Sequence, residues 1–164
     1  METTSKITEV INKQIGVEGF TSQFYLNIAS YCDYKGYKNS AKWFYKNATE
    51  KIKHREIFVK YLCERKREMV IEEIKIPSNK ITSLSNCFEI SLKKEQDITK
   101  LIEGIYEICL IEKDHITRNF MEWFINEQRN SENILNTILD TIKTFPKEQV
   151  NYLIERLIKD MEMD

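Results

Sequence analysis

The stretch "AKWFYKNATEKIKHREIFVKYL", residues 41–62, carries apolar side chains at helical spacing, with charged groups in the middle of the same face. The expected inward stripe runs through Ala41, Phe44, Ala48, Lys51, Arg55, Phe58 and Leu62. This stripe predicts a long helix over about 38–65. Near its middle, Glu50 and His54 suggest a metal site, whereas Lys51 between them suggests a salt-bridged helix instead.

The same period recurs along the rest of the chain and predicts three more long helices and a short one. The long helices are expected at about 5–33, 84–111 and 114–142, and the short amphipathic one at about 146–160. Gly36 supplies a turn, Ser83 is a candidate N-cap, and Pro77 lies in the long connection before Ser83. The sequence therefore predicts an all-α antiparallel four-helix bundle, about 5–142, with one long crossover and a short fifth helix.

Composition and charge narrow the class of protein. The 164 residues are 31% charged and 41% hydrophobic, with only 4 Gly and 2 Pro, so a single all-α domain over 1–164 is expected. A net charge of -1 predicts no nucleic-acid partner. No signal-type start or membrane-length apolar run is present, so a cytoplasmic location without a membrane partner is expected. The four cysteines form no C-x-x-C pair and are predicted to be reduced core thiols.

Polar residues interrupt each predicted apolar stripe near the middle of its helix. They are Glu18 on the first helix, Lys51 and His54 on the second, Glu95 on the third, and Glu127, Gln128 and Ser131 on the fourth. In a bundle with antiparallel neighbours, mid-helix positions share one height, so these groups are expected to meet in the core. Buried charge is costly unless it is paired or bound to metal.

Three stretches give the sequence a resemblance to ferritins of the bacterial non-haem type. Residues 11–44, "INKQIGVEGFTSQFYLNIASYCDYKGYKNSAKWF", resemble the first helix, turn and second-helix start of that family. Residues 119–128, "NFMEWFINEQ", resemble its fourth helix, and residues 93–102, "KKEQDITKLI", its third. The resemblance implies a ferritin-like bundle, a homo-oligomeric cage of two dozen subunits, and storage of iron as a ferric mineral.

The resemblance also implies roles for individual residues. Glu18, His54 and Glu95 match positions that bind iron at the family's di-iron ferroxidase centre. Gln128 matches a glutamine that supports the bound oxygen species, and Tyr25 matches an electron-donating tyrosine. Glu50 and Glu127 match glutamates of an accessory third iron site. Ile52 stands where haem-binding relatives have methionine, so no haem is expected.

The departures from the family pattern affect the same centre. Lys51 replaces the bridging glutamate, Ser131 replaces a glutamate that holds the second iron, and Asn130 replaces an accessory glutamate. Desolvation lowers a lysine pKa, but nearby glutamates oppose that shift, so Lys51 is expected to stay charged and to pair with Glu95, Glu18 or both. Its ammonium then replaces the metals as the counter-charge.

The sequence is compatible with more than one metal-binding state of this centre. The favoured prediction is an iron-storage subunit with a silent ferroxidase centre, co-assembling with an active ferritin subunit or acting alone. The alternatives are a weakened single-metal site at Glu18 and His54, a relocated site at Glu50 and Glu127, or an active ferroxidase at a remodelled site.

Overall fold

The computed structural model describes residues 5–78 and 80–162, which form five α-helices and one short 3-10 helix. The elements are α1 (Ser5–Lys35), α2 (Lys38–Glu64), α3 (Leu84–Ile111), α4 (His115–Ile142), η1 (Lys147–Gln149) and α5 (Val150–Met161). The predicted α3 bounds are confirmed, and the other long helices differ from prediction by one or two residues. The last helix differs more, because Pro146 precedes η1 and α5 begins only at Val150.

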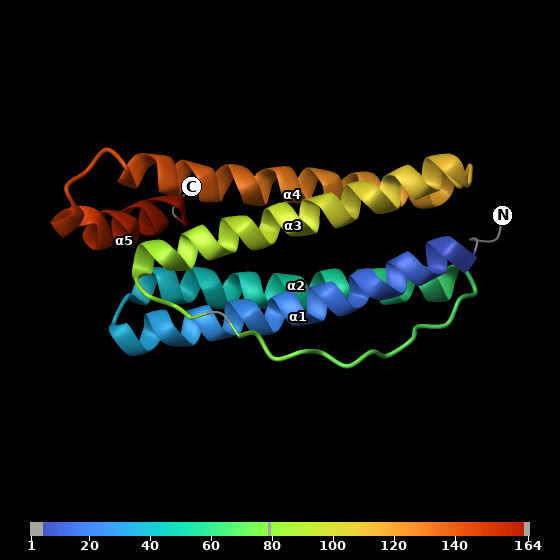
Figure 1. The fold of residues 1–164 in the computed structure, drawn as a ribbon, viewed down its shortest axis with the longest axis horizontal. Coiled ribbons are helices and arrows are strands. Elements are labelled where there is room, and N and C mark those ends of the chain that lie inside the picture. The colour runs from blue at the N-terminus through green and yellow to red at the C-terminus, as the bar shows by residue number, and fades with distance from the viewer. Residues whose placement is uncertain (1–4, 79, 163–164) are drawn as a thin grey trace.

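The four long helices lie side by side as two antiparallel pairs, α1 with α2 and α3 with α4 (Figure 1). The connection from α2 to α3 runs back along the length of the bundle, and α5 packs at the end where α3 begins (Figure 1). This arrangement confirms the predicted bundle with one long crossover and a short fifth helix. None of the described helices is both long and apolar enough to cross a membrane.

The helix ends are built from ordinary capping devices. Gly36 takes a φ of +86°, which only glycine adopts without strain, and turns the chain from α1 into α2. Ser83 caps α3 as predicted, because its side chain accepts a hydrogen bond from the Asn86 backbone N–H at 3.0 Å. The Asp114 carboxylate caps α4 by accepting from the Thr117 backbone N–H at 2.9 Å.

A residue of α5 caps the start of α2. The Glu155 carboxylate accepts hydrogen bonds from the backbone N–H groups of Asn39 and Ser40, each at 2.8 Å. These are donors that a helix N-terminus leaves unpaired, and a negative charge there also complements the helix dipole. This contact fixes α5 against the bundle.

A buried amide anchors the crossover to α1. The Asn12 side chain accepts a hydrogen bond from the Val70 backbone N–H at 2.8 Å and donates to the Glu68 carbonyl oxygen at 3.5 Å. The described residues of the crossover, 65–78 and 80–83, form no helix or strand, so these bonds occupy backbone groups that would otherwise depend on water.

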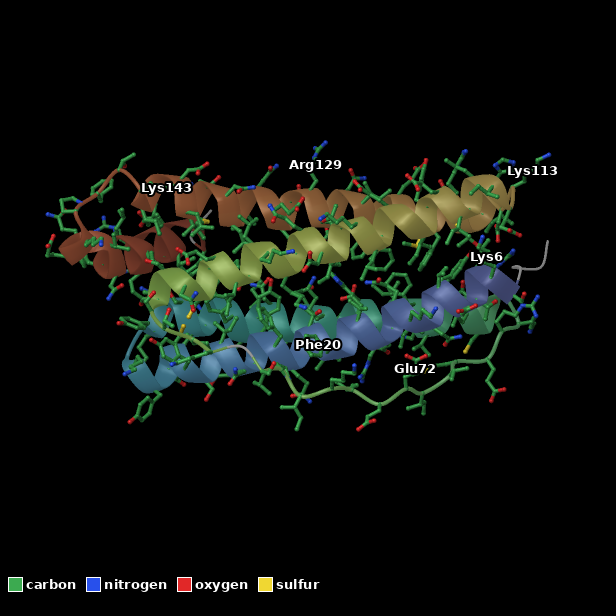
Figure 2. The ribbon with its side chains drawn as sticks, in the orientation of Figure 1. Lys6, Phe20, Glu72, Lys113, Arg129 and Lys143 are labelled. Carbon is green, nitrogen blue, oxygen red and sulfur yellow. The ribbon has the colours of Figure 1, made fainter. Side chains whose placement is uncertain are left out.

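The core consists of two apolar clusters with polar residues between them. On α1, Ile15 belongs to one cluster and Phe24 to the other, and the buried Glu18 lies between them. The same alternation brings Lys51, Glu95 and Gln128 between the clusters on the other long helices. Figure 2 shows the opposite face of α4, where Arg129 points away from the bundle. The predicted mid-helix polar layer is therefore present.

One prediction about the cysteines is wrong. Cys32, Cys87 and Cys109 are buried free thiols, as expected, but Cys63 is exposed. Cys63 follows Leu62, which faces the core, and adjacent helical residues lie about 100° apart around the axis. The Cys63 side chain therefore points out of the bundle.

Candidate metal centre

The polar layer opens to the surface through a pocket between α2 and α4 with a volume of about 240 Å3. Its walls include Trp43, Lys46, Asn47 and Glu50 from α2 and Glu127, Asn130, Ser131, Ile134 and Leu135 from α4. Tyr25, Lys51 and His54 line it as well, and each of these three side chains is buried. The pocket therefore connects the surface with the groups that the sequence predicted to meet.

Lys51 and Glu95 form an ion pair in the middle of the core. Lys51 Nζ lies 3.0 Å from both carboxylate oxygens of Glu95. The Lys51 side chain is 3% exposed and that of Glu95 is 1% exposed, so water does not screen the pair. The predicted pairing of Lys51 with Glu95 is present, whereas Glu18 acts on Lys51 through its charge alone.

Two further groups complete the hydrogen bonding of Glu95. The Tyr25 hydroxyl donates to Glu95 Oε1 at 2.5 Å, and Gln128 Nε2 donates to Glu95 Oε2 at 2.9 Å. Gln128 also donates to the Glu95 carbonyl oxygen at 3.1 Å and to the Thr99 hydroxyl at 3.3 Å. The carboxylate thus accepts from an ammonium, a phenol and an amide.

The pKa values of this group follow from burial and charge. Burial disfavours the Lys51 ammonium, but the negative charges of Glu95 and Glu18 outweigh burial and hold the pKa of Lys51 above its ordinary value. Burial likewise disfavours the Glu95 carboxylate, yet the Lys51 charge and the hydrogen bonds hold its pKa below the ordinary value. Burial and then the Glu95 charge raise the pKa of Tyr25, which remains a hydrogen-bond donor. Lys51 and Glu95 are therefore both charged at neutral pH.

The other half of the layer is less completely paired. Gln14 Nε2 donates to Glu18 Oε1 at 3.0 Å, but Glu18 Oε2 has no hydrogen-bond partner. His54 Nδ1 faces this oxygen at 3.7 Å, beyond hydrogen-bonding distance, and has no hydrogen-bond partner either. Trp123 and Phe124 contact the His54 ring edge to face and fix its plane. Two buried polar atoms thus face each other with unused binding capacity.

The remaining candidate residues lie at the rim of the pocket. Glu50, Glu127 and Ser131 are half-buried, and Asn130 is exposed. Glu50 accepts from Lys53 on the helix surface at 3.3 Å. The expectation that Glu127 and Ser131 meet Gln128 in the core is therefore not met, because only Gln128 of the three is buried.

The donor set does not fit a pair of metal ions. Among residues 5–78 and 80–162, no three Asp, Glu, His or Cys side chains converge into a group that could hold a metal ion. The Lys51 ammonium contacts both oxygens of the Glu95 carboxylate. Repulsion between such an ammonium and a divalent ion about 4 Å away amounts to several kcal/mol at an effective dielectric near 20.

The sequence matches a known protein family over most of its length. Residues 8–145 match the family model of ferritin, described as the ferritin-like domain. The chain belongs to the ferritin family. The match covers the crossover and the four long helices except the first three residues of α1, so ferritin membership rests on the whole bundle rather than on one motif.

The curated relatives of this ferritin include bacterial proteins that match most of the chain. The bacterial non-heme ferritin of Campylobacter jejuni is 29% identical over 161 residues, covering 98% of this chain and 96% of the relative. The bacterial non-heme ferritin of Staphylococcus epidermidis is 28% identical over 137 residues, covering 84% of this chain and 82% of the relative.

Solved structures support the same fold. An open pore ferritin from Archaeoglobus fulgidus superposes with a TM-score of 0.87 at 27% identity, covering 94% of this chain and 96% of that chain. A closed form of the Archaeoglobus fulgidus ferritin, engineered by site-directed mutagenesis, gives 0.89 at 26% identity, covering 96% and 97%.

Two residues of this ferritin's polar layer were not singled out from sequence. Gln14 holds Glu18 from one turn earlier, and Thr99 accepts from Gln128. The i, i+4 spacing of Gln14 and Glu18 was available as a signal, because such residues are neighbours on one helix face. Thr99 gave no comparable signal, because it contacts a residue of another helix.

Proposed function

We propose that this chain is a cytoplasmic iron-storage subunit whose own di-iron centre is kept closed by Lys51. Family membership and the names of the relatives support iron storage. The main support for a centre that cannot bind two metal ions is the buried ion pair, in which Lys51 Nζ lies 3.0 Å from both carboxylate oxygens of Glu95. A carboxylate that already accepts from an ammonium, a phenol and an amide has little capacity left for a bridging metal.

The charge balance of the layer supports the same proposal. Glu18 and Glu95 supply two negative charges, and Lys51 already offsets one of them before any metal arrives. Two Fe(II) ions bring four positive charges, which a set with one uncompensated carboxylate cannot balance. In this subunit iron is therefore cargo for the assembly rather than a substrate oxidised inside its own bundle.

The test is the rate of Fe(II) oxidation, followed by absorbance at sub-stoichiometric iron. The unmodified protein is expected to oxidise Fe(II) slowly, and Lys51→Glu/Ser131→Glu is expected to be faster by at least about tenfold, or about 1.4 kcal/mol in the barrier. Lys53→Glu is the control for the lysine substitution, because it makes the same charge change as Lys51→Glu two residues away on the exposed side of α2. Rapid oxidation by the unmodified protein refutes the closed centre.

Assembly into a cage is part of the proposal and has its own measurement. Light scattering coupled to size exclusion is expected to give a mass near two dozen times the 19.6 kDa of one chain. Co-expression with an active bacterial ferritin then tests whether mixed cages form, through purification by a tag on one subunit alone. A stable monomer or dimer refutes the storage cage.

A second candidate function is the binding of a single divalent ion by Glu18 and His54. It is favoured by Glu18 Oε2 and His54 Nδ1, which are buried, unpartnered and 3.7 Å apart. Titration calorimetry with Zn2+ tests it, with His54→Ala expected to lose the signal and His115→Ala, at an exposed histidine, to keep it. Binding that survives in both variants refutes this candidate.

A further inference from the structure

A groove between α1 and α3 leaves apolar side chains accessible. The two helices lie side by side (Figure 1), and the groove between them has a volume of about 210 Å3. Its apolar lining consists of Val10, Val17, Leu101, Ile105 and Ile108. Leu101 is 48% exposed, although a leucine side chain gains free energy when it leaves water. The groove therefore offers apolar surface that a ligand could bury.

Gly104 adds to the depth of this groove. It lies in the middle of α3 and lines the groove, at a position where glycine is less favourable than alanine in a helix. Apart from its own helix backbone, no described heavy atom lies within 4 Å of a Cβ added at Gly104. At Gly19, by contrast, an added Cβ would meet Ile74 Cδ1 at 3.0 Å, so close packing explains that glycine. Packing does not explain Gly104, whereas room for a ligand does.

Two lysines stand at the mouth of the groove, one on each helix. Lys13 of α1 and Lys100 of α3 both line it, and both are exposed. Among the described residues that line the groove, none is acidic. Lys13 also pairs with Glu9 at 2.7 Å, but both side chains are more than half exposed, and exposed pairs of this kind are weak. The mouth of the groove therefore favours an anionic head group.

The lining also distinguishes between an alkyl chain and a peptide. Besides the two lysines, Gln14 supplies the polar part of the lining, and its amide already donates to Glu18 Oε1 at 3.0 Å. An extended peptide would leave backbone N–H and C=O groups unpaired against apolar side chains, which is costly, whereas an alkyl chain has no such groups. The lining of α3 runs from Lys100 to Ile108, about 12 Å along the helix axis, which suits one alkyl chain of medium length.

We propose that the groove between α1 and α3 binds a free medium-chain fatty acid, with its alkyl chain over Gly104 and its carboxylate between Lys13 and Lys100. Burial of the chain supplies most of the binding free energy, and the two ammonium groups orient the head. The inference is independent of the proposed iron storage, because none of the candidate iron ligands lines this groove.

The experiment titrates decanoate, below its micelle-forming concentration, into the iron-free assembled protein in a calorimeter. Saturable binding of one decanoate per chain is expected. Octanoate, which buries two fewer methylene groups, is expected to bind about fifteenfold more weakly. Decyltrimethylammonium has the same chain with a positive head and is expected to bind more weakly than decanoate. The proposal is overturned if decanoate shows no saturable binding, if the cation binds equally well, or if the protein binds only to phosphatidylglycerol vesicles.

Variants of the groove show where the ligand lies. Gly104→Leu is expected to abolish decanoate binding without lowering the unfolding temperature, and Gly104→Ala to weaken it. Glu103→Leu is the control for the added side chain, because Glu103 is exposed and does not line the groove. Lys100→Glu is expected to weaken binding at least about fivefold, whereas Lys60→Glu, at an exposed ion pair of α2, is expected to leave it unchanged. Full binding by both Gly104 variants would overturn the proposal.

Discussion

The two halves of the polar layer differ in how completely their buried groups are paired. Around Glu95, an ammonium, a phenol and an amide use both carboxylate oxygens. Around Glu18, one oxygen accepts from Gln14 while the other faces His54 at 3.7 Å without a hydrogen bond. The difference teaches that Lys51 fully pairs one buried carboxylate of the layer and leaves the other with an unused oxygen, which is the basis of the proposed closed centre.

The largest expected effect comes from removing the ammonium of the closed half. Lys51→Met should lower the free energy of unfolding by about 3–5 kcal/mol at neutral pH, because it leaves the buried Glu95 carboxylate without its counter-charge. Urea unfolding followed by circular dichroism measures this. Lys53→Met, at an exposed ion pair on the same helix, should change the free energy by less than about 1 kcal/mol. Similar effects from the two variants would contradict the account.

The pH dependence of the free energy of unfolding also tests the difference between the two halves of the polar layer. The pKa of Glu95 is lowered in the folded protein, so its contribution to stability is present above the ordinary glutamate pKa and is lost as pH falls through the folded value. The pKa of Lys51 is raised, so its contribution is present below the ordinary lysine pKa and is lost as pH rises through the folded value. The stability of the wild type should therefore fall at both extremes, in urea titrations from acid to alkaline pH.

Lys51→Met should change the acid side of this profile. Without the ammonium, burial favours protonated Glu95, so the variant should approach the wild type in stability as the pH falls toward 4. A gap between wild type and variant that stays constant from pH 7 to pH 4 would show that Glu95 does not carry the effect.

A smaller effect is expected from the phenol of the closed half. Tyr25→Phe removes the hydroxyl that donates to Glu95 at 2.5 Å, and a hydrogen bond to a charged group contributes about 1.5–3 kcal/mol. Thermal and urea unfolding measure the loss. Tyr34→Phe is the control, because Tyr34 is 87% exposed and should have little effect.

The smallest effect is expected in the open half. Glu18→Gln keeps an acceptor for Gln14 and removes a buried charge whose second oxygen has no hydrogen-bond partner. The free energy of unfolding should therefore stay within about 1 kcal/mol of the wild type. A loss as large as that of Lys51→Met would show that the two halves are equally dependent on their charges.

Much of the bundle could be predicted from the sequence, because apolar stripes at helical spacing identify both the helices and their inward faces. The stripes identified Glu18, Lys51 and Glu95 as mid-helix groups of one layer, and Ser83 as a cap. The stripes did not show that Ser131 lies at the pocket rim while Gln128 is buried in the core. At about 100° per residue, Ser131 lies roughly 60° around the helix from Gln128, enough to turn it to the pocket rim.

Other features depend on contacts between distant parts of the chain, which helical spacing does not encode. Glu155 of α5 caps α2 from more than a hundred residues away, and Asn12 of α1 accepts a hydrogen bond from the Val70 backbone N–H in the crossover. The exact partner of Lys51 was open for the same reason, since Glu18 and Glu95 lie at one height in the bundle. The way that α2 packs against α1 and α3 in the folded bundle decides between them.

The most direct test of the lysine-closed centre is anomalous diffraction from wild-type crystals soaked in Fe(II) without oxygen. The account predicts that Lys51 Nζ stays against the Glu95 carboxylate and that no iron lies within bonding distance of Glu95. Iron bridging Glu18 and Glu95, with the Lys51 side chain displaced, would contradict it.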